Sequence, residues 1–276
     1  MTDGTGKDRI RMTVAEARAL GEAALRGAGY DEDDARILTD HVLDAALCGY
    51  EYSGLPKLLN VVDYPDFKLP RRPISVVRET AATAMLDGGN NTGMVAAYRA
   101  AEATILRAEA NGLAIVVLAN TWMTGRSAYY CEMIARAGLV VIDTVASPPA
   151  VAPFGGARLT LGTNPVAFGF PTATDPIVID MGTSAFMATD LQYRARLSTP
   201  IPEGVALGPD GRPTTDATAA RLGTLLSFGG PEGGYKGFGL ALAMDALGAP
   251  DRRDAAGGRG PRLCVHRVSA AARIRA

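Results

Sequence analysis

Two short apolar runs place the strongest constraint on how this chain can fold. Residues 113–118 and residues 139–145 are rich in valine, leucine and isoleucine, which is the pattern of strands buried inside a sheet. Between them, residues 127–137 have the composition of a helix that ends at Gly138. A buried strand, a helix and a second buried strand in succession predict an α/β fold.

The segments on either side extend this unit. Thr13 and Glu16 form the capping-box pattern of a helix that ends near Gly27 or Gly29, and Asp31 can serve as the N-cap of a second helix. Because strands and helices alternate only in part, the sheet is expected to be mixed. Further strands are expected at residues 74–79, 83–86, 165–170 and 177–179, and further helices at residues 92–110, 215–226 and 237–247.

The chain is expected to have three parts, namely an N-terminal helical segment at residues 1–73, an α/β body at residues 74–248 and a divergent basic tail at residues 249–276. Residues 50–73 contain three prolines and should be a loop-rich connection. The tail has seven arginines and two aspartates without sustained periodicity. This composition fits a gene read in another frame. Alternatively, the tail is a new functional terminus, and residues 262–275 then form a short basic helix.

Composition excludes several classes of function. The 276 residues are 47% hydrophobic and 21% charged, which fits a globular protein and neither a disordered chain nor a membrane protein. The first residues have no apolar signal-peptide core, so we expect a cytoplasmic protein. A net charge of −1 gives no overall attraction to nucleic acid. Three scattered cysteines and two histidines exclude a Cys/His zinc site, and no metal is expected.

The most distinctive residues are two blocks, SPPAVAPFGG from Ser147 and LGTNPVAF from Leu161. With further blocks, these resemble the malate/L-lactate dehydrogenase-like family over residues 12–248. No G-x-G-x-x-G motif follows a strand, so nothing supports a Rossmann nucleotide site. The further blocks are residues 40–49, 86–93, 120–133, 180–184 and 234–240.

The resemblance implies a fold and an activity. The fold is a mixed sheet with flanking helices, of the L-sulfolactate/malate dehydrogenase type, which differs from the Rossmann fold. Members of the family reduce 2-oxo acids or cyclic imino acids with NADH or NADPH, and they form homodimers. We therefore expect a small-molecule substrate, a nicotinamide cofactor and a homodimer.

The chain departs from the family pattern where the chemistry occurs. Ser53 stands where the family has a histidine thought to act as acid or base, and Met123 replaces a second histidine. Ketone reduction leaves an alkoxide that must be protonated, and a suitable acid contributes about 10²–10⁴-fold. A serine hydroxyl is a poor acid and methionine carries no proton. Reduction of an already protonated imine should survive these changes better than ketone reduction.

Three residues remain as catalytic candidates, namely Asp180, Ser53 and Lys57. The resemblance places Asp180 near the nicotinamide, as an acid/base or orienting group; alternatively, it caps the next helix through the amides of Thr183 and Ser184. Lys57 stands at a family arginine and could hold a substrate carboxylate as a point charge. Alternatively, Lys57 is an ordinary solvated lysine.

The resemblance also assigns residues to the cofactor. A glycine-rich stretch at residues 233–237 leads into an apolar helix, where amides and a lysine would favour a phosphate. Such stretches are often only turns. Asp190 replaces a family lysine, and its charge would repel a phosphate at that point. The expected cofactor-binding residues are Ser147, Ile179, Met181, Gly182, Tyr235 and Lys236.

Aromatic residues cluster around the two altered motifs. Tyr52, Trp122 and Met123 are expected to line a substrate pocket, and an aromatic pocket suits a larger, flatter substrate. The alternative is that most of these side chains belong to the core or to an interface. His41 is expected to be a helix histidine that makes local hydrogen bonds, and Cys131 to be buried packing.

Three functions are compatible with these observations. The first is an NAD(P)H-dependent reductase with Asp180 and Ser53 at the acid/base site. The second is a non-redox cyclase or isomerase of a biosynthetic pathway, built on the same scaffold. The third is a non-catalytic relic or binding subunit, for which the lost histidines and the altered tail argue.

Overall fold

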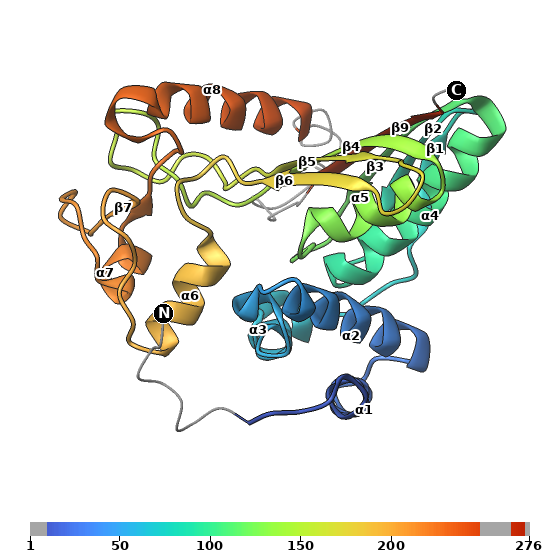
Figure 1. Cartoon of the computed structure of the whole chain (residues 1–276), viewed down its shortest axis with the longest axis horizontal. Helices are drawn as coiled ribbons and strands as arrows, with labels where there is room; N and C mark the ends of the chain where they lie inside the picture. The colour runs from blue at the N-terminus through green and yellow to red at the C-terminus, as the bar shows by residue number, and fades with distance from the viewer. Residues whose placement is uncertain (1–9, 249–265, 274–276) are drawn as a thin grey trace.

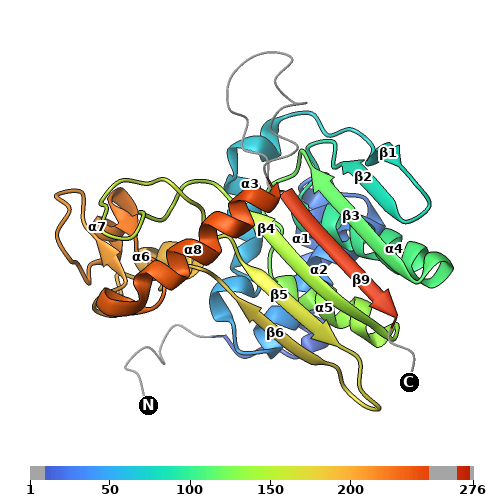
Figure 2. The ribbon, with the colours of Figure 1, turned by 90° about the horizontal axis from the view of Figure 1, so that it is seen from above.

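A seven-stranded sheet forms the centre of the molecule (Figures 1 and 2). The computed structural model describes residues 10–248 and 266–273. Strands β2 and β3 are parallel and the other neighbours are antiparallel, which confirms the predicted mixed α/β fold. The order across the sheet is β1 (Ser75–Glu79), β2 (Thr83–Asp87), β3 (Leu113–Ala119), β9 (His266–Arg273), β4 (Leu139–Ala146), β5 (Val166–Phe170) and β6 (Ile177–Met181).

Helices cover the two faces of the sheet unequally. Helices α4 (Gly93–Asn111) and α5 (Ser127–Arg136) pack on one face, and α8 (Gly230–Gly248) crosses part of the other (Figure 1). The buried side of α4 is mostly alanine, which lets the helix approach the sheet closely. Gly112 ends α4 in the left-handed conformation, as a helix C-cap commonly does.

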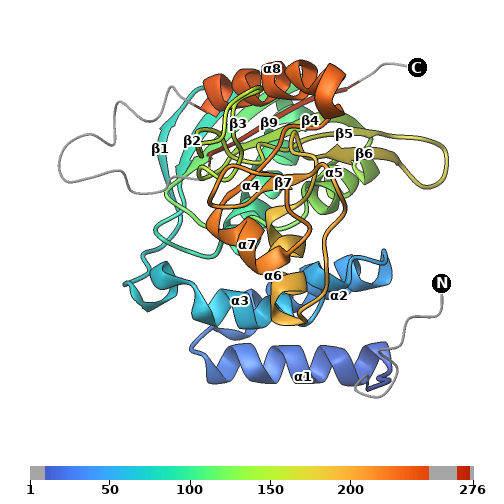
Figure 3. The same ribbon diagram turned by 90° about the vertical axis from the view of Figure 1, so that its left-hand side faces the viewer.

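The N-terminal helices form a separate layer below α4 and α5 (Figures 1 and 3). The predicted caps of α1 (Val14–Gly27) and α2 (Glu32–Leu47) are confirmed: Thr13 and Glu16 form a capping box, and Asp31 accepts from the Asp34 amide. This layer shares a hydrophobic cluster with α4, which includes Leu38 and Met94. The layer is therefore fixed to the body by buried apolar contacts.

The prediction of a loop over residues 50–73 was wrong, because this stretch contains three short helices. Pro56 precedes α3 (Lys57–Asp63) and Pro65 opens the 3₁₀ helix η2 (Pro65–Lys68), so the prolines delimit helices without interrupting them. The first of the three is the 3₁₀ helix η1 (Glu51–Ser53). These helices determine where Ser53 and Lys57 lie.

A small lobe follows β6. It contains α6 (Ala188–Arg196), α7 (Ala217–Leu222) and the two-stranded pair β7 (Ala206–Leu207) and β8 (Thr224–Leu225), around a cluster of its own. Helix α6 was not predicted from the sequence, and α7 ends four residues before the predicted boundary.

Helix α8 begins seven residues earlier than predicted. Its glycines are required by packing: a Cβ at Gly234 would press on the Phe154 ring, and one at Gly237 would meet the backbone of Phe228. The glycine-rich stretch is thus part of the helix, and it does not form a turn before it.

The tail contributes the central strand, which corrects the expected basic helix over residues 262–275. Residues of β9 pair on both sides, with Ala270 opposite Ile115 of β3 and Ile142 of β4. Because β9 is antiparallel to both neighbours, it fills a gap one strand wide and satisfies their hydrogen-bonding edges. Residues 249–265 and 274–276 lie outside the described residues, and the division at residues 73 and 248 stays a prediction.

Candidate active site

Lys57 is buried at the junction between α3 and the small lobe. Only 6% of the residue is exposed, and its Nζ donates to Thr189 Oγ1 of α6 at 3.2 Å. Among the described residues, no carboxylate lies within ion-pair distance of this ammonium group. Burial therefore lowers the pKa of Lys57 to about 8. The alternative of a solvated lysine does not hold.

Tyr52 and Ser53 lie in η1, immediately before Lys57. The Tyr52 ring meets the Tyr50 ring edge-on at 5.9 Å. Burial raises the pKa of Tyr52 to about 12, with further contributions from the charges of Asp190 and Asp180. Tyr52 is therefore a neutral phenol within electrostatic range of two carboxylates. Ser53 is half-buried, and its amide donates to the Tyr50 carbonyl.

Asp180 lies on the edge strand β6 and caps a helix. Its Oδ2 accepts from the Ala128 amide in the first turn of α5 at 2.8 Å, where a negative charge is favourable. The alternative expected from the sequence was that Asp180 caps the next helix through the amides of Thr183 and Ser184. This is wrong for Thr183, because its amide donates to the Thr163 carbonyl. The residue is exposed, so the carboxylate reaches solvent while it holds α5.

The loop before α5 is held by His41. Its Nε2 accepts from the Arg126 amide at 2.9 Å, and Gly125, at φ 72°, packs so closely on the imidazole that no Cβ would fit. The expected local hydrogen bonds of His41 are therefore replaced by a contact between α2 and a distant loop. His41 positions the segment that contains Met123.

Arg126 is a site residue that sequence reasoning missed. Its guanidinium pairs with Asp44 of α2 and lies 3.7 Å from Glu132. Its charge also acts on the Tyr52 phenol, lowering the pKa of Tyr52 against the opposing effects of burial and the carboxylates. Arg126 and Asp44 are 82 positions apart in the sequence, so no local pattern could have paired them.

The predicted aromatic pocket does not form as one cluster. Trp122 is 1% exposed, stacks on Tyr64 at 4.9 Å and donates from Nε1 to the Asn90 carbonyl at 3.2 Å. Met123 has a positive φ of 59° and packs against the same buried cluster. Trp122 is thus a core residue, and Tyr52 is the member of the predicted set that meets the catalytic candidates.

Two of the predicted cofactor segments meet at Thr163. Ser147 donates its amide to Asn164 Oδ1 at 2.9 Å, and its hydroxyl lies 3.3 Å from Thr163 Oγ1. The Thr163 carbonyl accepts from the amide that follows Gly182. Ser147 and Gly182 are therefore brought together at the ends of β4 and β6.

Two further predicted cofactor residues, Ile179 and Met181, lie on the opposite face of the sheet from Asp180. Ile179 and Met181 are exposed neighbours of Asp180 on β6, and successive residues of a strand point to opposite faces. Asp180 faces α5, so Ile179 and Met181 share the face that α8 crosses.

Tyr235 and Lys236 lie on α8 itself. Tyr235 is 54% exposed and lies 6.2 Å from the Phe154 ring, and Lys236 Nζ lies 5.9 Å from the Tyr235 ring. Both residues are inside the helix, so Lys236 could contact a phosphate through its side chain but not together with the amides of the helix N-terminus.

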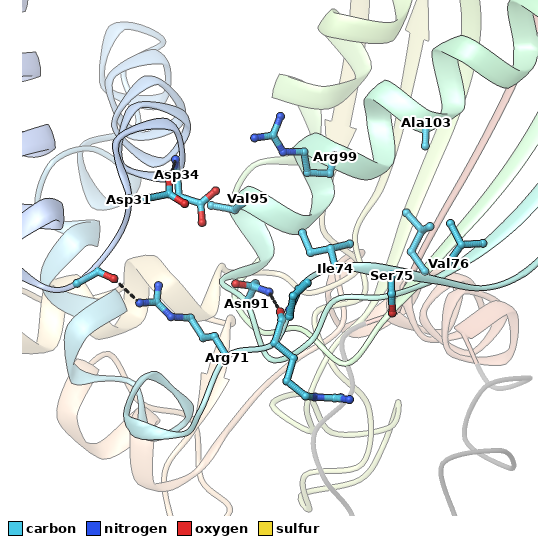
Figure 4. Close-up of a pocket in the computed structure, with 14 residues that line it drawn as sticks. Asp31, Asp34, Arg71, Ile74, Ser75, Val76, Asn91, Val95, Arg99 and Ala103 are labelled. Atoms are coloured by element: carbon cyan, nitrogen blue, oxygen red, sulfur yellow. Dashed lines mark hydrogen bonds between the residues drawn. The ribbon is translucent and has the colours of Figure 1, made fainter.

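A separate cleft of about 660 Å³ lies between α2, α4 and β1 (Figure 4). Asp34, Arg71 and Arg99 face it, and Arg71 donates to the Gly29 carbonyl at 2.6 Å. This cleft contains none of the predicted site residues. In the part of the chain that the structure describes, no group of three or more His, Cys, Asp or Glu side chains could hold a metal ion. In that same part, no helix is long and apolar enough to cross a membrane.

Comparisons with known proteins agree with the resemblance. A sequence profile of the malate/L-lactate dehydrogenase family matches residues 12–259. The L-sulfolactate dehydrogenase of Methanocaldococcus jannaschii is 36% identical over 228 residues, which are 82% of this chain and 65% of that protein. The solved sulfolactate dehydrogenase structure from that organism superposes with a TM-score of 0.78 at 31% identity, over 96% of this chain and 78% of that one.

Two further relatives differ in what their names describe. The (2R)-3-sulfolactate dehydrogenase (NADP(+)) of Chromohalobacter salexigens is 33% identical over 246 residues, which are 86% of this chain and 71% of that protein. The Δ1-piperideine-2-carboxylate reductase structure from Pseudomonas syringae superposes with a TM-score of 0.78 at 26% identity, over 95% of this chain and 82% of that one. These matches confirm the predicted sulfolactate/malate dehydrogenase-like fold. The chain therefore belongs to the malate/L-lactate dehydrogenase family.

Proposed function

We propose that this protein is an oxidoreductase that reduces a cyclic imino acid or a 2-oxo acid with NADH or NADPH. The observation that carries the proposal is the buried ammonium group of Lys57, whose side-chain partner among the described residues is a hydroxyl and not a carboxylate. The names of the relatives describe malate, lactate, sulfolactate and a piperideine carboxylate, all of which contain a carboxylate. Lys57 is the cation that would bind it.

Burial makes Lys57 suited to this role. A desolvated ammonium group gains more from an incoming carboxylate than an exposed one would, because little water screens the pair. Thr189 Oγ1 holds Nζ at 3.2 Å and leaves the other two donors of the ammonium for a ligand. Asp190 pairs with Arg194 at 3.3 Å, and not with Lys57.

The described residues also fit a nicotinamide dinucleotide. When bound, the nicotinamide would supply the hydride. Ser147 and Gly182 offer polar groups at adjacent strand ends, and the exposed Ile179 and Met181 offer apolar contact along β6. Lys236 and Tyr235 are exposed on α8, on the same face of the sheet, where a phosphate and a ring could bind.

The altered acid/base residues favour the imine over the ketone as substrate. An iminium carries its proton before hydride transfer, so it needs no acid at the acceptor atom. Asp180, fixed on the amide of Ala128, would stabilise the positive charge of the iminium and orient it. Ser53 would contribute a hydrogen bond from its hydroxyl.

We also propose that the protein is a cytoplasmic homodimer. On the face of the sheet that α8 crosses, the part that α8 does not cover has exposed apolar side chains, and patches of this kind mark protein–protein contacts. Size-exclusion chromatography with light scattering would report the mass. The exposed side chains include Leu113, Ile115, Ile142 and Ile177.

One set of measurements tests the function. Fluorescence titration with NADH and NADPH should show binding, and the protein should oxidise the bound cofactor with Δ1-piperideine-2-carboxylate, pyruvate or oxaloacetate. Lys57→Met should lose turnover through a raised KM, because it removes the cation for the carboxylate. The matched control Lys68→Met changes an exposed lysine near α3 and should leave KM unchanged.

A non-redox cyclase or isomerase is the second candidate, and the anionic Asp190 at a family lysine position favours it. It predicts turnover that does not depend on NADH or NADPH. Absence of cofactor binding at millimolar concentration would exclude the reductase and leave this candidate or a non-catalytic relic.

A further inference from the structure

We propose that the cleft between α2, α4 and β1 binds a free α-amino acid with a large apolar side chain (Figure 4). The cleft holds about 660 Å³, which lies in the usual range of small-ligand sites. Among the described residues that line it, none is a catalytic or cofactor-binding candidate. It would therefore be a second binding site, and it does not depend on the proposed reductase function.

Asp34 brings an unmatched negative charge into the cleft (Figure 4). The residue is half-buried in the first turn of α2, and among the described residues no cation lies within ion-pair distance of it. Its exposed neighbour Asp33 pairs with Arg36 and Arg99 instead. Burial and the charge of Asp31 raise the pKa of Asp34, because both disfavour a carboxylate there. An ammonium group of a ligand would relieve this cost.

Arg71 brings an unmatched positive charge into the same cleft. Its guanidinium lies over the Tyr30 ring at 4.2 Å and donates to the Gly29 carbonyl at 2.6 Å. In the described part of the chain, no carboxylate lies within ion-pair distance of it. A guanidinium has five N–H donors, so most of them are left for a ligand. The ring contact holds the planar group in a fixed orientation, which suits a bidentate contact with a carboxylate.

The two other arginines that line the cleft already have carboxylate partners. Arg72 pairs with Asp87 at 3.0 Å. Arg99 pairs with Asp33 and, at 3.1 Å, with Glu102. A ligand carboxylate would therefore bind the remaining guanidinium. A polyanion such as a phosphate ester fits less well, because a single cation is left for it and the carboxylates at the start of α2 would repel it.

The two unmatched groups are arranged for a ligand that carries both charges. Asp34 and Arg71 lie beyond ion-pair distance of each other, yet the charge of Arg71 still acts on Asp34. A molecule with an ammonium and a carboxylate group on one carbon can bridge such a gap, with each group donating to or accepting from its counterpart. This is the chemistry of a free α-amino acid.

Apolar side chains complete the lining and indicate what else the ligand carries. Leu86 and Val95 are buried at the cleft, and Ile74 and Val76 leave apolar surface exposed in it. Covering this surface would remove it from water, which favours binding. A large apolar side chain on the amino acid would provide that cover.

Calorimetric titration of the unaltered protein with L-phenylalanine and two analogues tests which charges the ligand needs. The analogue 3-phenylpropionate lacks the ammonium group, and 2-phenylethylamine lacks the carboxylate. L-Phenylalanine should bind with a Kd of about 1 mM or tighter. Each analogue should bind at least about tenfold more weakly, because it leaves one charged group of the cleft without a partner. The titrations need no cofactor, so they remain valid whether or not the protein is a reductase.

Substitutions locate the site. Asp34→Asn and Arg71→Met should each weaken the binding of L-phenylalanine about tenfold or more. The matched controls Glu203→Gln and Arg158→Met, at exposed positions outside the cleft, should bind it as the unaltered protein does. Lys57→Met should also bind it unchanged, which separates the cleft from the proposed substrate site.

Three results would overturn the proposal. The first is no binding of L-phenylalanine at about 10 mM, and the second is equal binding of either analogue. The third is binding that is lost in Lys57→Met and kept in Asp34→Asn, which would place the amino acid in the proposed substrate site. Because Arg71 also holds the Gly29 carbonyl, the analogue titrations decide the question even if Arg71→Met does not fold.

Discussion

At the scale of single residues, the buried Lys57 is the strongest sign of function, because it destabilises the fold that contains it. Folding takes its ammonium group out of water, and the only side-chain partner that the described residues provide for it is the Thr189 hydroxyl, not a carboxylate. Such a cost persists where a ligand later compensates for it.

Replacing this ammonium should therefore stabilise the protein. A pKa lowered from 10.5 to about 8 corresponds to about 3 kcal/mol of destabilisation at neutral pH. The folded state binds fewer protons than the unfolded state between these values, so the unaltered protein should gain stability as pH rises from 8 to 10.5. We expect Lys57→Met to be more stable by up to about 3 kcal/mol at pH 7, and this advantage to vanish above pH 10.5, measured by urea unfolding. A Lys57→Met protein that is less stable at pH 7 would contradict the assignment.

The same titration should appear in the kinetics. In the proposed function the ammonium form of Lys57 binds the substrate carboxylate, and this form is lost as pH rises through about 8. KM for the acid substrate should rise above that pH by about tenfold per unit, while kcat stays flat. A pH series of initial rates measures both constants, and a KM that is constant to pH 9.5 would contradict the role of Lys57.

The sequence could identify some of these residues but not their surroundings. Lys57 was predicted because its position in a motif resembles that of a family arginine. Its burial depends on Thr189, which is 132 residues away. Trp122 was misplaced in a pocket because nothing in the motif reveals Tyr64 stacked on its other side.

At the scale of secondary structure, strongly periodic or capped elements were predictable and short ones were not. The helices that begin at Val14 and Glu32 have their predicted caps. Helix α3 was missed because its flanking prolines look like a loop, and α6 because it has only one fully buried residue, Leu191. Lys57 and Thr189 lie on these two missed helices, so their contact could not be predicted from the sequence.

Asp180 caps helix α5 and is also a catalytic candidate, and two substitutions separate these two roles. Asp180→Ala removes the oxygen that caps α5 and should cost about 1 kcal/mol of stability. Asp180→Asn keeps an oxygen acceptor for the Ala128 amide, so stability should change little while turnover falls through loss of the charge. Urea unfolding and initial rates measure the two effects. The control Asp175→Ala removes an exposed carboxylate that pairs with Arg136 and should leave turnover unaltered. Equal turnover in Asp180→Asn and the unaltered protein would leave Asp180 as a helix cap alone.

At the scale of the whole molecule, the feature that no local pattern could predict is the central strand. The sequence of residues 266–273 is rich in alanine and arginine, which suggested a helix. What makes it a strand is the space between β3 and β4, whose facing backbone groups need partners. The chain spans 65% of the length of the M. jannaschii relative, and in this chain β9 pairs with both β3 and β4.

A proline in this strand should be far more harmful than a proline at the edge of the sheet. Ala270 has partners on both sides, in β3 and β4, so Ala270→Pro removes ladder hydrogen bonds from the middle of the sheet and should lower the free energy of unfolding by about 3 kcal/mol or more. The matched control Val77→Pro lies in the edge strand β1, at an exposed position where the register shifts, and should cost much less. Urea unfolding of the two variants measures the difference. The result depends only on backbone pairing, so it tests the position of β9 independently of any activity. Equal losses of stability would mean that the strand does not occupy the centre of the sheet. The ends of β4 and β6 that hold Ser147 and Gly182 together would then need another support.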